Sequence, residues 1–269
     1  MRRQRKQSAE IRTPSGVLLV AGAALVGYVM ARQSRPEMLY LSGFLLLLSL
    51  SSLLPNMQPY GRLLTAFLGT CLGLSVASLT APAALPASIL TSRPEVANAA
   101  FKAVWVMTAV LVALIAGWNL SDLDWRWGRS KPGHWVLALA SLGMVLVYYR
   151  HFYRPVTPLV TNLPSFWPAA LGLSAFFGLT NSLAEEYLFR RLVQGPCIRT
   201  LGPAWGLAAQ AIMYGCLHLG LASRPNGPAG ALAMTVLGWV LGYITYRGKG
   251  LGIATTVHAV LDTLIFWWG

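Results

Sequence analysis

The chain has 269 residues, of which 55% are hydrophobic and only 11% charged, and 21 Lys and Arg against 8 Asp and Glu give a formal net charge of +13. A soluble domain carries roughly 25% charged residues and at most about half apolar ones. The composition, with a mean hydropathy of +0.56, therefore excludes a disordered chain, a coiled coil and an ordinary cytosolic enzyme, and it indicates a polytopic membrane protein.

The apolar residues fall into blocks of about 16 to 22 residues, long enough to cross a hydrocarbon core of roughly 30 Å. The breaks between blocks carry turn residues, for example Gly202-Pro203 and Pro225-Asn226-Gly227-Pro228. We predict an all-α, polytopic transmembrane helix bundle of about eight or nine spans. In chain order the candidate helices are 15–31, 38–54, 62–81, 99–118, 134–149, 166–194, 203–222, 228–246 and 250–268.

Most basic residues lie in the short loops between blocks. In membrane proteins, loops rich in Lys and Arg are usually cytoplasmic, so their distribution indicates the orientation of the chain. If the N-terminus is inside and the blocks alternate, 14 Lys and Arg residues fall on the inner side and 6 on the outer side. This asymmetry predicts a multi-pass protein of the cell membrane with a cytoplasmic N-terminus, a cytoplasmic 119–133 loop and an outer C-terminus. The expected partner of the positive charge is the lipid bilayer, and we expect no nucleic acid. A cleaved signal peptide is the alternative interpretation of the first block, but eight more blocks follow it.

Two glycine pairs, Gly69/Gly73 and Gly238/Gly242, have the GxxxG spacing that allows close contact between membrane helices. Both lie inside candidate spans. We expect them at helix–helix interfaces.

Ionisable side chains within the spans carry the functional information. Each costs at least about 2.5–3.5 kcal/mol on insertion scales, and such residues usually face the protein interior. The first five spans hold almost none beyond Lys102, near a span end. We therefore divide the chain into an N-terminal scaffold of five spans, residues 1–150, and a catalytic helical domain of four spans, residues 151–269. The ionisable residues of the last four spans are Glu185, Glu186, Arg190, His218, His258 and Asp262.

The spacing of these residues is helical. Residues four apart share one face of a helix, whereas Glu185 is displaced by about 100° from its neighbour. One carboxylate of the Glu-Glu pair can thus be held by Arg190 while the other points into a cavity without a cation, as a candidate general base. Structural ion pairs and interhelical hydrogen bonds are the alternative explanation for each pair taken alone. The i,i+4 pairs are Glu186/Arg190, Tyr214/His218 and His258/Asp262.

Three motifs resemble a known family. The segment 185–190, Glu-Glu-Tyr-Leu-Phe-Arg, matches the EExxxR motif of the CPBP family of intramembrane glutamate endopeptidases (CAAX protease and bacteriocin-processing proteins, also named Abi), which includes the type II CAAX prenyl endopeptidases. The segment 214–218 resembles its FxxxH motif with Tyr214 in place of Phe, and 258–262 resembles HxxxN or HxxxD. The resemblance covers about residues 165–268, and residues 1–150 resemble no family that we can name.

The resemblance implies a role for each motif residue. An ionised Asp262 cannot donate a hydrogen bond to an oxyanion, and the prenyl proteases carry Asn at this position. Asp262 could instead keep His258 protonated, so that the imidazolium is the donor. The implied roles are water activation by Glu185 with His218, oxyanion stabilisation by His258 with Asp262, and support of the site by Glu186 with Arg190.

The resemblance implies acid–base chemistry without a metal or another cofactor. Glu, His, His and Asp also make a plausible zinc set, but the HExxH motif is absent. We predict an endopeptidase that hydrolyses a peptide bond with Glu/His-activated water. Its substrate would be a membrane-associated or leader-type peptide, a CAAX-like C-terminus or another membrane protein. The alternative is a non-catalytic scaffold, immunity or assembly protein that retains the fold. A transporter is less favoured because no inverted repeat is visible. The oligomeric state stays open.

Two geometric expectations follow. Glu185, His218 and His258 should converge on one cavity. Counted along the helices at about 1.5 Å per residue, Glu185 and His258 lie about 12–15 Å from the cytoplasmic span ends and His218 about 22 Å. Either the seventh helix starts deeper than Pro203 or the cavity slants.

Overall fold

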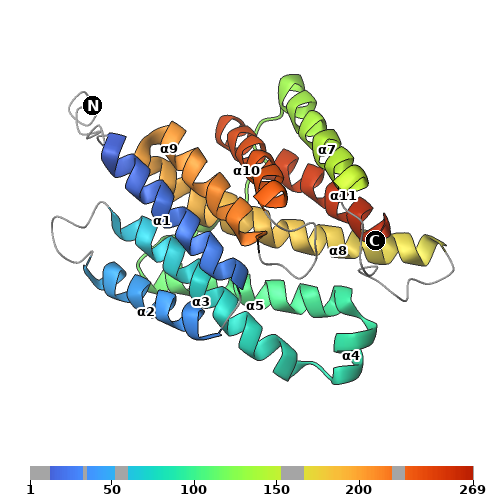
Figure 1. The fold of residues 1–269 in the computed structure, drawn as a ribbon, viewed down its shortest axis with the longest axis horizontal. Helices are drawn as coiled ribbons and strands as arrows, with labels where there is room; N and C mark the ends of the chain where they lie inside the picture. The colour runs from blue at the N-terminus through green and yellow to red at the C-terminus, as the bar shows by residue number, and fades with distance from the viewer. Residues whose placement is uncertain (1–12, 33–34, 52–59, 153–166, 220–227, 269) are drawn as a thin grey trace.

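The computed structural model describes residues 13–32, 35–51, 60–152, 167–219 and 228–268, and this part of the chain contains helices and no strand. The expected all-α, polytopic helical bundle is therefore confirmed (Figure 1). The elements are α1 (Thr13–Arg32), α2 (Arg35–Ser51), α3 (Gly61–Ala84), α4 (Ala87–Ser92), α5 (Pro94–Ile115), α6 (Leu120–Leu123), α7 (Pro132–Phe152), α8 (Trp167–Glu186), η3 (Tyr187–Val193), α9 (Gln194–Leu217), α10 (Pro228–Gly248) and α11 (Gly252–Trp268).

Each of the nine predicted spans corresponds to a helix, and the short helices α4 and α6 were not predicted. The fourth predicted span, 99–118, is shifted: α5 begins at Pro94, whose fixed φ suits the first helical position. It ends at Ile115 because Gly117 adopts a φ of 81°. Residues 52–54, 166 and 220–222 of the predicted spans, and the predicted break at residues 225–227, lie outside the described residues.

The helices that matter for function meet around α8. Figure 1 shows α2, α3 and α5 together on one side of the bundle and α7, α10 and α11 on the other. Helix α8 packs against α5 on one side and α11 on the other, and α9 packs against α1 and α10. The loop after α6 closes over the turn between α10 and α11: the amide of Arg129 donates to the carbonyl of Gly248, and the amide of Leu251 donates to the carbonyl of Arg126, both at 2.7 Å.

Both predicted GxxxG pairs lie at helix–helix interfaces. A Cβ atom on Gly73 would lie 2.6 Å from the carbonyl oxygen of Trp105, so α3 and α5 touch there through backbone atoms. A Cβ on Gly242 would lie 2.7 Å from Oε1 of Gln210, at the contact between α10 and α9. The first glycine of each pair faces the same partner helix. The expectation is confirmed for both pairs.

The helical path that carries the Glu-Glu pair is longer than predicted. Helix α8 runs directly into the π-helical segment η3, and the amide of Gln194 donates to the carbonyl of Phe189, five residues earlier. The path then continues to the bend at Gly202, which has φ 80° and ψ 168°. A Cβ on Gly206 would lie 2.6 Å from Cα of Ile198, whereas eight residues of straight helix span about 12 Å. The chain therefore folds back at Gly202-Pro203, as predicted, but the sixth span does not end at residue 194.

This extension resolves the difference in depth between Glu185 and His218. Glu185 lies 16 residues before Leu201, and His218 lies 15 residues after Pro203. These separations correspond to about 24 Å and 22 Å of helix, measured from the same bend. The two side chains thus start from matching levels because the bend lies farther along the chain than the predicted end of the sixth span.

The surface of the bundle is suited to lipid. Within the described residues, four helices are long and apolar enough to cross a membrane by length and composition: Gly61–Ala84, Glu95–Ile115, Pro132–Arg150 and Pro228–Gly248. Only 22% of the most apolar stretch is buried in the second and third of these, and both carry exposed large side chains such as Met107 and Val136. An apolar face of this extent needs a non-aqueous neighbour. The protein is a multi-pass membrane protein.

Candidate active site

The polar side chains singled out in the sequence lie on four neighbouring elements of the C-terminal half. The end of α8 supplies Glu185 and Glu186, and η3 follows at once with Arg190. The end of α9 supplies Tyr214 and His218, and the middle of α11 supplies His258 and Asp262. Segments of π-helix are uncommon and occur frequently at functional sites. Here the segment begins directly after the two glutamates.

Glu186 is the best-held carboxylate of the site. Its Oε1 lies 2.8 Å from Nδ1 of His258, and its Oε2 lies 3.2 Å from Nε of Arg190. The side chains of Glu186 and Arg190 are fully buried, and the guanidinium of Arg190 lies over the ring of Tyr214 at 4.5 Å. An ionised carboxylate can only accept hydrogen bonds, so Nδ1 of His258 is the donor. The predicted pairing of Glu186 with Arg190 is therefore present, and a histidine of another helix shares it.

The second ring nitrogen of His258 faces a group of oxygen atoms. With Nδ1 held by Glu186, Nε2 lies 3.4 Å from the hydroxyl of Tyr214, 3.4 Å from Oδ2 of Asp262 and 3.8 Å from Oε2 of Glu185. His258 is 2% exposed and Tyr214 1% exposed. Side chains from α8, α9 and α11 thus converge on one imidazole in the interior of the protein.

Glu185 has a cation, contrary to the expectation from sequence. Its Oε1 lies 2.5 Å from Nζ of Lys102, which reaches it from α5 in the N-terminal half. Oε2 is buried and makes no hydrogen bond among the described residues. The cost of an ionisable group in a span was the signal that could have identified Lys102. We missed it because Lys102 stood almost alone among the ionisable residues of the first five spans and lay near a predicted span end.

Asp262 is held by a second residue that sequence reasoning missed. Nδ2 of Asn181 donates to Oδ2 of Asp262 at 2.8 Å. Asn181 precedes Glu185 by four residues on α8, so it lies on the same helix face, and this spacing was the available signal. The predicted i,i+4 contact of Asp262 with His258 is present at 3.4 Å.

His218 stands at the end of α9, apart from the carboxylates. Its Nδ1 lies 2.8 Å from the carbonyl oxygen of Tyr214, so that nitrogen is the donor and Nε2 is left free of this bond. The Tyr214 ring contacts both histidines, with centroid distances of 4.8 Å to His218 and 6.2 Å to His258. The charge of Glu185 acts on the His218 ring, but no hydrogen bond or ion pair links these two side chains in the described part of the chain. The structure brings Glu185 to His258 directly and joins His218 to them through Tyr214.

Histidine, cysteine, aspartate and glutamate are the side chains that hold metal ions in proteins, and their placement decides whether the cluster could bind one. Among the described residues, no group of three or more His, Cys, Asp or Glu side chains is placed so that it could hold a metal ion. The three cysteines are free thiols. What the cluster offers chemically is three carboxylates, two imidazoles and a phenol, which are acid–base groups.

Comparison with known proteins agrees with the motifs. Residues 166–264 match the family described as type II CAAX prenyl endopeptidase Rce1-like. Neither a search of curated proteins nor a search of solved structures gives a match. The matched segment includes every motif residue from Glu185 to Asp262 but not Lys102, and it indicates a CAAX-type protease as the kind of protein. Residues 166–264 of this chain are therefore similar to the Rce1-like family, in agreement with the CPBP resemblance of the three motifs.

Proposed function

We propose that the protein is an intramembrane endopeptidase that hydrolyses a peptide bond with water activated by Glu185 and His218, without a metal ion. The observation that carries the proposal is that His258 of α11 lies 2.8 Å from Glu186 and 3.8 Å from Glu185, the two adjacent glutamates at the end of α8. All three are at least 95% buried. Packing alone gives no reason to place so many ionisable groups in apolar spans, where each is costly.

Glu185 is the general base of the proposed reaction. Lys102 occupies Oε1, which leaves Oε2 with no hydrogen bond and 3.8 Å from Nε2 of His258. A water molecule there would give a proton to Oε2 while its oxygen attacks the carbonyl carbon of the scissile bond. When the carbon–nitrogen bond breaks, the same carboxyl would return the proton to the leaving amine nitrogen.

His258 is the proposed donor to the oxyanion. Glu186 fixes its ring through Nδ1, so Nε2 points at the oxygen cluster in a preset orientation. Donors held in place before the reaction are the largest single contribution to many acyl-transfer reactions. The hydroxyl of Tyr214, 3.4 Å from Nε2, is a second candidate donor. Asp262, which stands where the prenyl proteases have Asn, would then keep His258 protonated, so that the imidazolium donates from Nε2 while Nδ1 donates to Glu186.

His218 is the proposed partner of Glu185 in water activation. Its Nδ1 is committed to the carbonyl of Tyr214, so Nε2 is available to accept a hydrogen bond from the same water. His218 caps the end of α9, and its ring lies beside that of Tyr214, whose hydroxyl is one of the oxygen atoms near Nε2 of His258.

Substrate, orientation and domain roles belong to the same proposal. The substrate would be the C-terminal tail of a prenylated protein, a leader-type peptide or another membrane protein. The protein would lie in the cell membrane with its N-terminus cytoplasmic and its C-terminus outside, as the distribution of basic residues favours. Residues 1–150 would be a scaffold and 151–269 the catalytic part. Because Lys102 pairs with Glu185, the scaffold would also supply a positive charge to the site.

The test is a comparison of membrane proteomes. Cells that carry the wild-type protein, the Glu185→Gln variant or the matched control Asp122→Asn are compared with cells that lack the protein. Asp122 is in α6 and pairs with Arg62 at 3.1 Å, outside the cluster. Uncut precursors should accumulate with Glu185→Gln and in the deletion, but not with Asp122→Asn. Accumulation in the deletion alone would contradict catalysis and favour a scaffold.

A further inference from the structure

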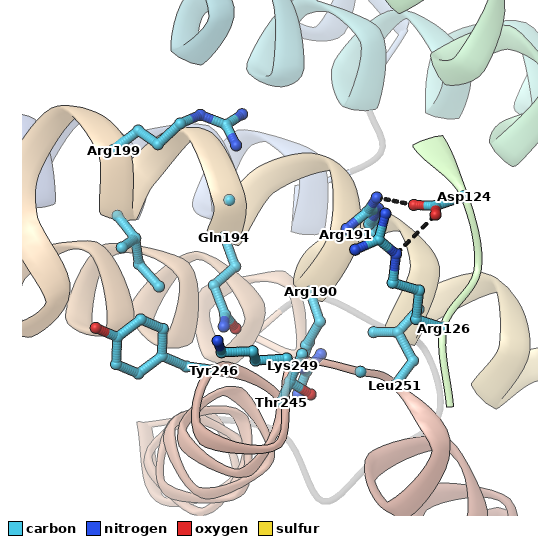
Figure 2. Close-up of a pocket in the computed structure, with 13 residues that line it drawn as sticks. Asp124, Arg126, Arg190, Arg191, Gln194, Arg199, Thr245, Tyr246, Lys249 and Leu251 are labelled. Carbon is cyan, nitrogen blue, oxygen red and sulfur yellow. Dashed lines mark hydrogen bonds and ion pairs between the residues drawn. The ribbon is translucent and has the colours of Figure 1, made fainter. Parts of the chain in front are cut away.

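A second site opens beside the candidate active site, where η3, the first turns of α9 and the end of α10 meet the loop after α6. The pocket there has a volume of about 290 Å³. A water molecule occupies about 30 Å³ in the liquid, and ligand pockets start at about 300 Å³, so the space suits a small polar headgroup better than a peptide. Figure 2 shows that the side chains around it come from all four of these elements.

The lining of this pocket is strongly basic. Five cationic residues border it, with one carboxylate. That carboxylate, Asp124, is shared by two of the cations: it pairs with Arg191 and accepts a hydrogen bond from Nε of Arg126 at 2.7 Å (Figure 2). Arg190 already forms a buried ion pair with Glu186. The lining charges are Arg126, Arg190, Arg191, Arg199, Lys249 and Asp124.

Two of the cations lack an acidic partner. Arg199 of α9 and Lys249, after α10, make no ion pair with the described residues, and both are exposed. The charge of Asp122 acts on Arg199, but that carboxylate is already bonded to Arg62 at 3.1 Å. Figure 2 places Arg199 and Lys249 on different sides of Gln194. An anion between them would therefore meet positive charge from two directions.

The floor of the pocket also holds polar atoms without partners. Oε1 of Gln194, Oγ1 of Thr245 and both terminal nitrogens of Arg190 are buried and make no hydrogen bond among the described residues. Gln194 is 3% exposed and uses only its Nε2, which donates to the carbonyl of Gly242 at 2.9 Å. Buried polar groups are nearly always satisfied, so a group left without a partner requires an explanation such as a missing ligand or water. The hydroxyl of Thr245 and the field of Arg190 both suit an anion above them.

We infer that this pocket is a binding site for a phosphate group, held by Arg199, Lys249 and the exposed edge of Arg191. Guanidinium groups match the oxygen geometry of phosphate, and a lysine adds a point charge. The phosphate could belong to an anionic phospholipid headgroup or be free in solution. Basic pockets between membrane helices on the cytoplasmic side bind anionic headgroups, and this end of the helices carries the loops expected to be cytoplasmic. The inference does not depend on the proposed protease function.

The test measures thermal unfolding of the purified full-length protein in a zwitterionic detergent. Phosphatidylglycerol, phosphatidylcholine or inorganic phosphate is titrated in separate arms, because a ligand that binds only the folded protein raises its melting temperature. The pocket variant is Arg199→Gln with Lys249→Gln. The matched control, Arg129→Gln with Arg247→Gln, removes two exposed cations near the same turn that do not line the pocket.

The wild type should be stabilised by phosphatidylglycerol and not by phosphatidylcholine. The pocket variant should bind it about 30-fold more weakly, roughly fivefold for each cation removed, while the control keeps the wild-type affinity. A single Arg199→Gln variant should bind phosphatidylglycerol about fivefold more weakly than the wild type. It keeps the inference testable if the double variant folds poorly. Stabilisation by inorganic phosphate alone would support the site and identify its ligand as free phosphate. Equal losses in the pocket and control variants, or no selectivity between the two lipids, would overturn the inference.

Discussion

The ion pair between Lys102 and Glu185 gives the sharpest prediction about how the two halves of the chain depend on each other. The side chains are 10% and 7% exposed, and their charged atoms are 2.5 Å apart. Lys102→Met would leave the carboxylate of Glu185 buried without its cation. Removing one partner of a buried pair costs about 3–5 kcal/mol. The variant should therefore lose about that much free energy of unfolding, although residue 102 lies outside the segment that matches the protease family.

A double-mutant cycle separates the pair from the packing of the individual side chains. Glu185→Gln keeps an amide oxygen that can accept from Lys102, so it should cost less than Lys102→Met. In the double variant neither charge remains, and its loss should be smaller than the sum of the single losses by about 0.5–3 kcal/mol. The measurement is unfolding of purified protein in mixed micelles as the fraction of denaturing detergent rises.

The control is Arg62→Met, which removes an ion pair with side chains 43% and 25% exposed. Exposed pairs contribute about 0–1 kcal/mol, so this variant should unfold almost as the wild type does. If the losses from Lys102→Met and Glu185→Gln simply add, the two side chains do not interact, and the account of Glu185 given above is wrong.

Three further predictions concern the packing and the chemistry of the site. Arg190→Ala should lower both activity and the free energy of unfolding, by about 3–5 kcal/mol, because it removes the cation of the fully buried Glu186; normal unfolding with full activity would contradict this role. Gly178→Ala should destabilise the protein by about 1–3 kcal/mol, since the new Cβ would lie 2.5 Å from a carbonyl oxygen of α11. Gly172→Ala in the same helix, where the new atom meets nothing within 4 Å, should not, and equal melting temperatures for the two would refute the close contact. Asp262→Asn should keep part of the cleavage activity and change its pH profile, whereas complete loss would show that the carboxylate does more than orient its neighbour.

Hydropathy and turn residues were sufficient to predict the nine long helices in the described part of the chain but not the short helices α4 and α6. The cost of burying charge placed the candidate site on the last four spans, and the three motifs pointed to Glu185, Glu186 and His258, which the structure brings together. Spacing along one helix correctly predicted the pair of Glu186 with Arg190. All of these inferences use the period of a single helix or the apolar length of a span, which are local properties of the sequence.

Contacts between helices were the part that the sequence did not reveal. Hydropathy says nothing about the rotation or depth of one helix against another, so neither Lys102 against Glu185 nor Asn181 against Asp262 was predicted. The π-helical segment was missed for a related reason. Its hydrogen bonds reach one residue farther than those of an α-helix, and that change carries no composition signal. The end of the sixth span was placed too early, at residue 194, for this reason, although the bend at Gly202-Pro203 itself was predicted.

The central claim is that the cluster around Glu185 cleaves peptide bonds, and cleavage by purified protein in lipid nanodiscs tests it most directly. The substrate is a precursor that accumulates in cells carrying Glu185→Gln, and each preparation is checked to be folded at the assay temperature. Loss of a general base costs about 10²–10⁴-fold in rate. The wild type and Asp122→Asn should cleave the precursor at equal rates, with or without a strong chelator, and Glu185→Gln should be at least about 100-fold slower. Full activity of Glu185→Gln would contradict the account.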